Sequence, residues 1–450
     1  MNNRSQNNTK NKLHALFAKH IRIQNKKFIP GKTLIPYAGT VFDEKELNAM
    51  ADVLLEGWFG LGKQGMLFEY EFAKYLGVKK AYLVNSGSSA DLLIMTALKS
   101  SKSSHQLKDG DEVITPACTF PTLIAALIHN RLKPVFVDID LKTLNPKPSD
   151  IYDAISRKTK AIFLVHSLGN PNDMYPILKV AKDNNLLVLE DNCDALGSTY
   201  KSKKTGSFGM MSTVSFYPAH HITTAGEGGA IVINDTRFQC IVQSLRDWGR
   251  DCWCSASGGP QKGLCGKRFS YKINGIPYDH KYIFSNIGYN LKPVELQAAM
   301  GRVQLKKLNQ FNTLRRNNFK EYDSFFKSYC RFFVPHSATN FSDPAWFAYP
   351  ITIKKKAPFK RRELTLYLEK HLIQTRPMFA GNILKQPGFI NINHRVSKPL
   401  VNSNAVFDGT FFIGLYPGIS KKHISYILQT IEKFLKKYTN KKSDKKFQDK

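Results

Sequence analysis

Two adjacent histidines, His220 and His221, lie in the segment SFYPAHHITTAGEGGAIV, which spans residues 215–232. An imidazole is a good proton acceptor near neutral pH, so either side chain could act as a general base. The ordinary alternative is a histidine whose hydrogen bonds serve only the fold, and it applies to His221 and to His166 alike. The segment therefore predicts a site of proton transfer.

Several polar or aromatic residues stand at the ends of apolar runs, where a phosphorylated cofactor could bind. In NSGSSADLL (85–93), small residues would let backbone N–H groups approach a phosphate at the start of a helix. Asp191 follows LLVLE and could pair with the protonated ring nitrogen of a pyridoxal-type cofactor, although a helix N-cap is an alternative. The Phe120 ring could stack on the cofactor or belong to the core, and the Ser215 hydroxyl could bind its phosphate.

Three of the seven cysteines, Cys252, Cys254 and Cys265, cluster in one Gly-rich segment. An odd cysteine count without an export signal argues against a disulfide framework.

The elements that must position these residues alternate between strands and helices. Seven runs are predicted as strands: KKAYLV, DEVIT, KPVFVDI, KAIFLV, LLVLE, TVSFY and GAIVI. Helical patterns at 90–99 and 175–184 lie between some of them. Such alternation indicates an α/β fold with a parallel or mixed sheet covered on both faces, and ligands bind beyond the carboxyl ends of its strands.

The pattern also divides the chain into parts. We expect a large cofactor-binding domain at 28–325, with a Cys- and Gly-rich insertion at 250–283. A smaller C-terminal α+β domain would span 326–436. Basic segments flank them, an N-terminal extension at 1–27 and a tail at 437–450.

Composition narrows the class of partners. The 450 residues carry a formal net charge of +31, partly in the two basic ends. A basic surface can attract nucleic acid, an anionic membrane or an anionic substrate. Because the excess is dispersed and no nucleic-acid-binding motif occurs, we expect no nucleic-acid partner. No apolar run is long enough for a membrane span. The amphipathic residues 13–21 could touch a membrane surface, but we expect them to pack on the protein body or a partner subunit.

The order of the motifs resembles the DegT/DnrJ/EryC1/StrS sugar aminotransferase family from about Phe42 to Pro417. The motifs are SGSSA, TFP, EDN, SFYP, GEGG and GYNLKPVELQAAMG. The resemblance implies the aspartate aminotransferase-like fold of pyridoxal-phosphate-dependent transferases of type I, a nucleotide-linked 4-keto sugar as substrate, and a homodimer. It also implies roles for individual side chains. Asp191 would pair with the ring nitrogen, Ser88, Ser89 and Ser215 would bind phosphate, Phe120 would stack, and Asn290 would reach the neighbouring subunit's phosphate.

In that family, position 220 normally holds the lysine that binds the cofactor covalently, and here it is His220. The resemblance then implies pyridoxamine 5'-phosphate held non-covalently, with His220 removing a proton so that the hydroxyl on sugar carbon 3 is expelled. Asp194 and Tyr217 would line the pocket, and Arg376, or else the Lys/Arg-rich segments, would meet the nucleotide diphosphate.

Four motifs look like the branch that dehydrates CDP-4-keto-6-deoxy-D-glucose at carbon 3 on the route to 3,6-dideoxyhexoses of lipopolysaccharide. They are SFYPAHHIT, HSLGNP, RPMFAGN and FFIGLYPGI. This likeness implies a [2Fe–2S] cluster on Cys193, Cys252, Cys254 and Cys265, a separate flavin/iron–sulfur reductase and a cytoplasmic location in bacteria. Four thiolates suit an iron–sulfur cluster or zinc, but their spacing matches neither zinc fingers nor the common ferredoxin runs. Four unrelated free cysteines are the alternative. The gap between Cys254 and Cys265 is longer than in that branch.

Other functions stay open at this point. A GDP-4-keto-6-deoxymannose 3-dehydratase also uses histidine but needs no metal cluster. An ordinary nucleotide-sugar aminotransferase would use some other lysine. An inactive relative, or a non-enzymatic basic protein that binds nucleic acid or membrane, would need none of this chemistry.

Overall fold

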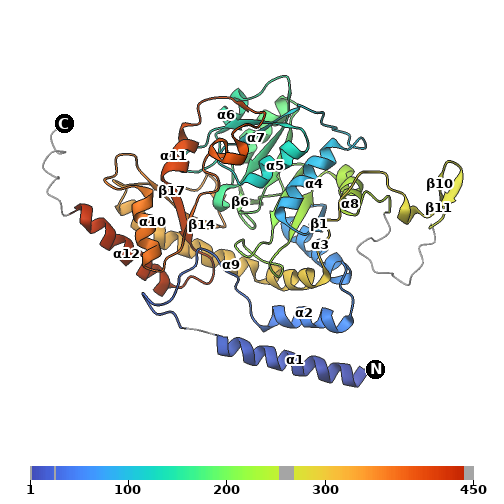
Figure 1. Cartoon of the computed structure of the whole chain (residues 1–450), viewed down its shortest axis with the longest axis horizontal. Coiled ribbons are helices and arrows are strands. Elements are labelled where there is room, and N and C mark those ends of the chain that lie inside the picture. Colours follow the sequence, from blue (N-terminus) through green and yellow to red (C-terminus); the bar gives the residue numbers. More distant parts are fainter. Residues whose placement is uncertain (1–2, 25–26, 253–267, 440–450) are drawn as a thin grey trace.

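An eight-stranded mixed sheet forms the centre of the computed structural model, which describes residues 3–24, 27–252 and 268–439 (Figure 1). The strand order is β1-β9-β8-β5-β4-β2-β3-β16. Their bounds are β1 (Lys80–Val84), β2 (Glu112–Pro116), β3 (Lys133–Val137), β4 (Thr159–Val165), β5 (Leu187–Asp191), β8 (Met211–Ser215), β9 (Gly229–Ile233) and β16 (Arg395–Val396). Neighbouring strands are parallel, except that β9 is antiparallel to both β1 and β8. The seven predicted strands are all present.

Helices cover both faces of this sheet because successive strand residues point to opposite sides. In β1, Tyr82 and Val84 join one apolar cluster with the helices α4, α5 and α8, whereas Ala81 and Leu83 join a second cluster with α3 and α9. A third cluster lies under α6 and α7. The bounds are α3 (Lys63–Leu76), α4 (Gly87–Lys99), α5 (Pro121–His129), α6 (Pro148–Asp153), α7 (Met174–Asp183), α8 (Gln239–Arg246) and α9 (Glu295–Ser328). Figure 1 shows α9 running beneath the sheet toward the C-terminal part.

The C-terminal part is a smaller α+β layer. Its antiparallel sheet has the order β12-β14-β17-β15. The elements are β12 (Phe333–Val334), β14 (Ala348–Ile353), α10 (Arg361–Lys370), β15 (Thr375–Pro377), α11 (Val401–Gly409), β17 (Thr410–Gly414) and α12 (Lys421–Thr439). Its own apolar cluster includes residues from the end of α9. The proposed domain limits at 326 and 436 remain a prediction.

Two features lie at the periphery of the molecule in Figure 1, α1 along its lower edge and a hairpin at its right. Helix α1 (Asn3–Gln24) lies along α2 (Glu44–Glu56), and Lys10 and His14 both reach Asp52, at 2.6 and 3.0 Å. The hairpin consists of β10 (Tyr271–Ile273) and β11 (Ile276–Tyr278) and projects from the 250–283 segment. Among the helices described, none is long and apolar enough to cross a membrane.

Short elements complete the described residues. These are β6 (Thr199–Tyr200), β7 (Lys203–Lys204) and β13 (Ser342–Asp343), with 3-10 helices at Ser167–Gly169, Thr236–Phe238, His280–Tyr282, Ile383–Lys385 and Pro387–Phe389.

Candidate active site

The predicted site residues converge where β5 and β8 end side by side in the middle of the large sheet. Asp191 is the last residue of β5 and pairs in register with Thr213 of β8, two residues before Ser215. The turn after β5 carries Cys193 and Asp194, and the turn after β8 carries His220. Parallel strands with a common direction thus bring these chain segments to one edge.

The start of α4 lies against the end of β8. Ser86 caps the helix by accepting from the Ser89 N–H at 3.0 Å, and Ser88 is exposed. A Cβ atom at Gly87 would come within 2.6 Å of the Ser215 Cβ, so only glycine allows this approach. The N–H groups at the start of α4 and the hydroxyls of Ser88 and Ser89 form a place suited to a phosphate.

Asp191 is buried, and burial raises the pKa of its carboxyl above the ordinary value. Its Oδ1 accepts from the Cys193 N–H at 3.0 Å. A turn and not a helix follows, so the N-cap alternative is wrong. A protonated ring nitrogen placed here would compensate the buried carboxylate, and so the residues fit a pyridoxal-type cofactor.

A second buried carboxyl lies close to the first. Asp91 on α4 is 2% exposed, and its Oδ2 accepts from the Thr122 hydroxyl at 3.3 Å. Burial, and then the charge of Asp191, raise the pKa of Asp91 well above its ordinary value. The proximity of the two carboxyls thus favours the protonated form of Asp91.

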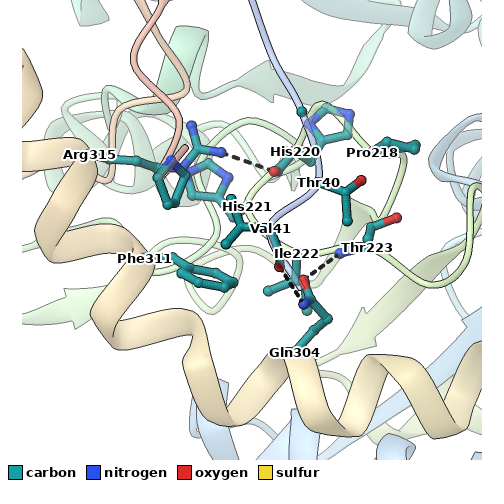
Figure 2. Close-up of a pocket in the computed structure, with 12 residues that line it drawn as sticks. Thr40, Val41, Pro218, His220, His221, Ile222, Thr223, Gln304, Phe311 and Arg315 are labelled. Carbon is teal, nitrogen blue, oxygen red and sulfur yellow. Dashed lines mark hydrogen bonds between the residues drawn. The ribbon is translucent and has the colours of Figure 1, made fainter. Parts of the chain in front are cut away.

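His220 lies beside a carboxylate. Its Nδ1 is 3.4 Å from Asp194 Oδ1, longer than an ordinary hydrogen bond. The imidazole is 5.3 Å from the Phe347 ring, centroid to centroid. In Figure 2 the residue lines a small cavity, and its ring points away from that of His221. Hydrogen bonds of catalytic groups are often long before substrate binds, so the pair is suited to proton transfer.

His221 is arranged differently from its neighbour. Its Nε2–H donates to the Ala345 carbonyl at 2.6 Å, and the side chain is buried. Burial, and then the charge of Arg315, lower the pKa of this imidazole well below its ordinary value. His221 is thus neutral, and its proton is held by a main-chain carbonyl.

Two predicted aromatic residues lie at the surface of the site. Phe120, the residue before α5, is 51% exposed, which excludes the core alternative. Tyr217 is 47% exposed, and its N–H donates to Ser215 Oγ at 3.2 Å. Both rings are available to contact a bound molecule.

Two other predicted residues are not joined to this group by any contact within the described chain. The side chain of Asn290 is exposed in the segment before α9. The guanidinium of Arg376 lies 4.3 Å from the centre of the Tyr37 ring and donates to the Thr375 carbonyl at 2.7 Å. Their roles toward a neighbouring subunit and a nucleotide diphosphate remain predictions.

The proposed cluster ligands fall in two places. Cys193 lies inside the site, where a Cβ at Gly87 would come within 3.2 Å of its Sγ. Burial, and then the charge of Asp191, raise the pKa of the Cys193 thiol well above its ordinary value. Cys252 follows α8, and Cys254 and Cys265 lie outside the described residues. Within the described part of the chain, no three His, Cys, Asp or Glu side chains are grouped as metal ligands.

Two contacts of His220 were not expected from the sequence. One is the Phe347 ring, and the other is Arg315 on α9, whose Nη2 donates to the His220 carbonyl at 3.0 Å. A signal for Arg315 does exist. It falls at helical spacing from Phe311, Phe319 and Tyr322, which all face the core, so its place on the buried stripe is readable.

Comparisons with known proteins agree with this arrangement. The sequence pattern of the DegT/DnrJ/EryC1/StrS aminotransferase family matches residues 41–432. A dTDP-4-dehydro-2,6-dideoxy-D-glucose 3-dehydratase of Saccharopolyspora spinosa is 44% identical over 93% of this chain and 90% of its own length. The lipopolysaccharide biosynthesis protein RfbH of Salmonella typhimurium is 41% identical over 95% of this chain and 98% of its own.

Solved structures support the same fold. The E coli GDP-4-keto-6-deoxy-D-mannose-3-dehydratase with bound hydrated PLP superposes with a TM-score of 0.79 at 32% identity. The match covers 88% of this chain and 98% of that one. The predicted aminotransferase-like fold of pyridoxal-phosphate-dependent enzymes is thereby confirmed.

Proposed function

Because the chain belongs to the DegT/DnrJ/EryC1/StrS aminotransferase family, we propose that it is a cofactor-dependent dehydratase of nucleotide-linked 4-keto-6-deoxy sugars. The observation that carries the proposal is His220 beside Asp194, in a segment 215–232 that contains no lysine. Dehydratases of dTDP- and GDP-linked sugars are among the relatives. An imidazole cannot bind the cofactor covalently as lysine does, but it can move a proton.

Each residue has a defined task in this proposal. When bound, pyridoxamine 5'-phosphate would supply the amine that condenses with the sugar ketone and the ring that accepts electrons. The α4 N-terminus with Ser88, Ser89 and Ser215 would hold its phosphate, and Asp191 would hold a proton on its ring nitrogen. Phe120 would cover the ring and exclude water from one face.

His220 is the proposed base. Its imidazole would accept the proton that must be lost before the hydroxyl at sugar carbon 3 can leave, and Asp194 would orient the ring and stabilise its protonated form. The side chain of Asp194 is 7% exposed, so its charge is poorly screened by water. Tyr217 and Arg376 would contact the substrate.

For the finer identity, we propose a CDP-linked substrate, as the four motifs indicate. The proposal also includes a [2Fe–2S] cluster on Cys193, Cys252, Cys254 and Cys265, a separate reductase, and a homodimer in the bacterial cytoplasm. The similarity to RfbH supports a role in lipopolysaccharide synthesis. The similarity to the dTDP- and GDP-sugar dehydratases keeps those nucleotides as alternatives.

The test is a substrate panel. Protein loaded with pyridoxamine phosphate would be incubated with CDP-, dTDP- and GDP-linked 4-keto-6-deoxyhexoses, with and without a flavin/iron–sulfur reductase, and the products weighed by mass spectrometry. Loss of the carbon-3 hydroxyl supports the proposal. An amino sugar as the sole product, together with borohydride trapping of pyridoxal phosphate on a lysine, would overturn it.

The cluster needs its own measurement. Iron and acid-labile sulfide would be assayed in anaerobically purified protein and in Cys252→Ser and Cys330→Ser variants. About two irons and two sulfides per chain, lost in the first variant and kept in the second, support the cluster. Absence of both elements from the unaltered protein favours the cluster-free GDP-sugar alternative.

A further inference from the structure

A buried arginine on α9 contacts the turn that carries His220. Arg315 is 1% exposed, and its guanidinium donates to three main-chain carbonyls. They belong to His220 at 3.0 Å, Phe347 at 2.8 Å and Trp346 at 3.2 Å. Figure 2 shows the guanidinium between α9 and the His220 carbonyl. Two chain segments more than 120 residues apart therefore meet on one side chain.

The arginine is charged but has no carboxylate within ion-pair distance among the residues described. Burial lowers the pKa of Arg315 to about 9, an effect that the charge of Asp194 partly opposes. Burying a guanidinium in this way is costly unless its hydrogen bonds are used. The three carbonyl contacts use Nη1 and Nη2, whereas Nε has no partner among the residues described. An apolar side chain would fill the space at a lower cost, so we attribute the arginine to these three contacts.

The other end of this contact is rigid. Trp346 stacks on Phe319, one turn further along α9, with ring centroids 3.9 Å apart and planes at 4°. The Phe347 N–H donates to the Leu168 carbonyl at 2.9 Å. Helix α9 and the 346–347 segment thus form a fixed frame, and Arg315 connects the His220 turn to it.

We propose that Arg315 is a positioning residue for His220, which it holds at a fixed place between Asp194 and the Phe347 ring. The imidazole is 5.3 Å from that ring and 3.4 Å from Asp194, and both distances depend on where the turn lies. A displacement of a reacting group by about 1 Å can lower a rate by roughly 10²-fold. The inference rests on the proposed function only in naming His220 as the base.

The experiment compares Arg315→Gln and Arg315→Lys with Arg316→Gln. Arg316 is a matched control because it is the next residue of the same helix and donates to Asp343 Oδ1 at 2.8 Å and to the Gly197 carbonyl at 3.3 Å, and not to the His220 turn. The first measurement needs no substrate. Diethylpyrocarbonate modification of His220 is followed by peptide mass spectrometry, with buried His166 as the internal reference, and hydrogen exchange is followed in peptides covering 216–224.

We expect Arg315→Gln to raise the His220 modification rate and the exchange of that peptide at least about threefold, while His166 and distant peptides stay unchanged. Arg315→Lys, which keeps one charged donor, should recover part of the effect, and Arg316→Gln should match the unaltered protein. Unchanged modification and exchange in Arg315→Gln would overturn the inference. Equal increases across the whole protein would also overturn it. If Arg315→Gln does not fold, Arg315→Lys is decisive, and modification and exchange equal to those of the unaltered protein would overturn the inference.

The second measurement is kinetic. With the substrate found in the panel, Arg315→Gln should lower kcat about 10- to 100-fold and change KM and cofactor affinity less than about threefold, with Arg315→Lys between it and the unaltered protein. Normal kcat in a folded Arg315→Gln protein would contradict the inference. If the panel yields no dehydration at all, the proposed function fails, and the modification and exchange data still decide whether Arg315 fixes the turn.

Discussion

Two histidine–carboxylate pairs lie at the carboxyl ends of β4, β5 and β8 and differ in their burial and in their hydrogen bonds. His166 and Glu190 are both fully buried, with Nε2 and Oε2 2.9 Å apart. His220 and Asp194 have side chains 16% and 7% exposed, with Nδ1 and Oδ1 3.4 Å apart. Both histidines follow a strand, β4 or β8.

The buried pair is fixed by hydrogen bonds on both sides. His166 Nδ1 accepts from the Asn172 N–H at 3.1 Å, so its single proton must be on Nε2 and point to Glu190. Glu190 also accepts from main-chain N–H groups of Gly206, Phe208 and Gly209, at 2.6 to 2.8 Å. Loss of this proton would break its buried hydrogen bond to Glu190, so we expect the pair to stabilise the fold.

The second pair, His220 and Asp194, has polar atoms that could still form hydrogen bonds. Neither His220 Nδ1 nor Asp194 Oδ2 has a hydrogen-bond partner among the residues described. Buried groups of this kind are costly unless a ligand completes them. The comparison teaches that the state of the hydrogen bonds, more than the presence of a histidine near a carboxylate, separates a candidate base from a structural residue.

The largest effect should follow from His220→Asn. Removing the base should lower the rate of carbon-3 dehydration by about 10³-fold or more, within the usual contribution of general base catalysis, while pyridoxamine phosphate stays bound. Product mass measures the dehydration, and the absorbance of the cofactor retained after gel filtration measures the binding of pyridoxamine phosphate. Full activity would place the base elsewhere and remove the distinction between the pairs.

A smaller loss is expected from Asp194→Asn. The imidazole would keep its place but lose the charge that stabilises its protonated form, so kcat should fall roughly 10- to 100-fold. Steady-state kinetics measure it, with Asp183→Asn on the exposed end of α7 as the control. If both variants have the same kcat, Asp194 does not act on His220.

His166→Asn should affect stability more than chemistry. Glu190 would lose one of its four donors in a buried place, which should cost about 1–3 kcal/mol of unfolding free energy. Denaturant unfolding measures this cost, and kcat of the folded fraction should stay within about threefold. A large loss of kcat at unchanged stability would instead assign His166 to the reaction.

The smallest effect concerns His221 and pH. Burial lowers the pKa of His221 from its ordinary 6.5, so the folded protein keeps it neutral while the unfolded chain binds a proton below pH 6.5. Stability therefore falls as the pH drops below that value. His221→Gln keeps an N–H for the Ala345 carbonyl but does not titrate, and it should reduce this slope by at most about 1.4 kcal/mol per pH unit.

Urea unfolding between pH 7 and 5 measures that slope. Buried His336, whose pKa is lowered to about 4 mainly by burial, contributes with the same sign in both proteins and cancels in the comparison. Identical slopes would show that His221 titrates normally in the folded state.

The sequence predicted the strands of the large sheet well because each is a short apolar run between polar segments. The convergence of Asp191, Ser215 and the α4 start could be predicted too, since parallel strands end at one edge. Strand β16 is only two residues long and has no period to detect. The hairpin β10–β11 was missed although Asn274 and Gly275 both have positive φ, as an Asn-Gly turn adopts.

What the sequence could not provide was the state of the two histidine pairs. His166 and His220 both follow apolar strands and both have acidic residues close in the predicted sheet. Which of the two pairs has its hydrogen bonds completed depends on N–H groups of residues such as Gly206 and Asn172, whose positions are set by turns. In the same way, Arg315 meets carbonyl groups, which every residue carries and no sequence pattern marks.

The short strand β16 has a consequence for how the protein is made. Its Arg395 binds the buried Glu112 of β2 at 2.7 Å across 283 residues of chain, and β16 pairs with β3 at the edge of the sheet. At common rates of translation, roughly tens of seconds pass between the synthesis of Glu112 and that of Arg395. Until then the cation next to Glu112 is Lys133 at 3.8 Å, and β3 is an open edge strand. The large sheet, although seven of its eight strands fall within residues 80–233, is therefore completed only after residues 395–396 have been made.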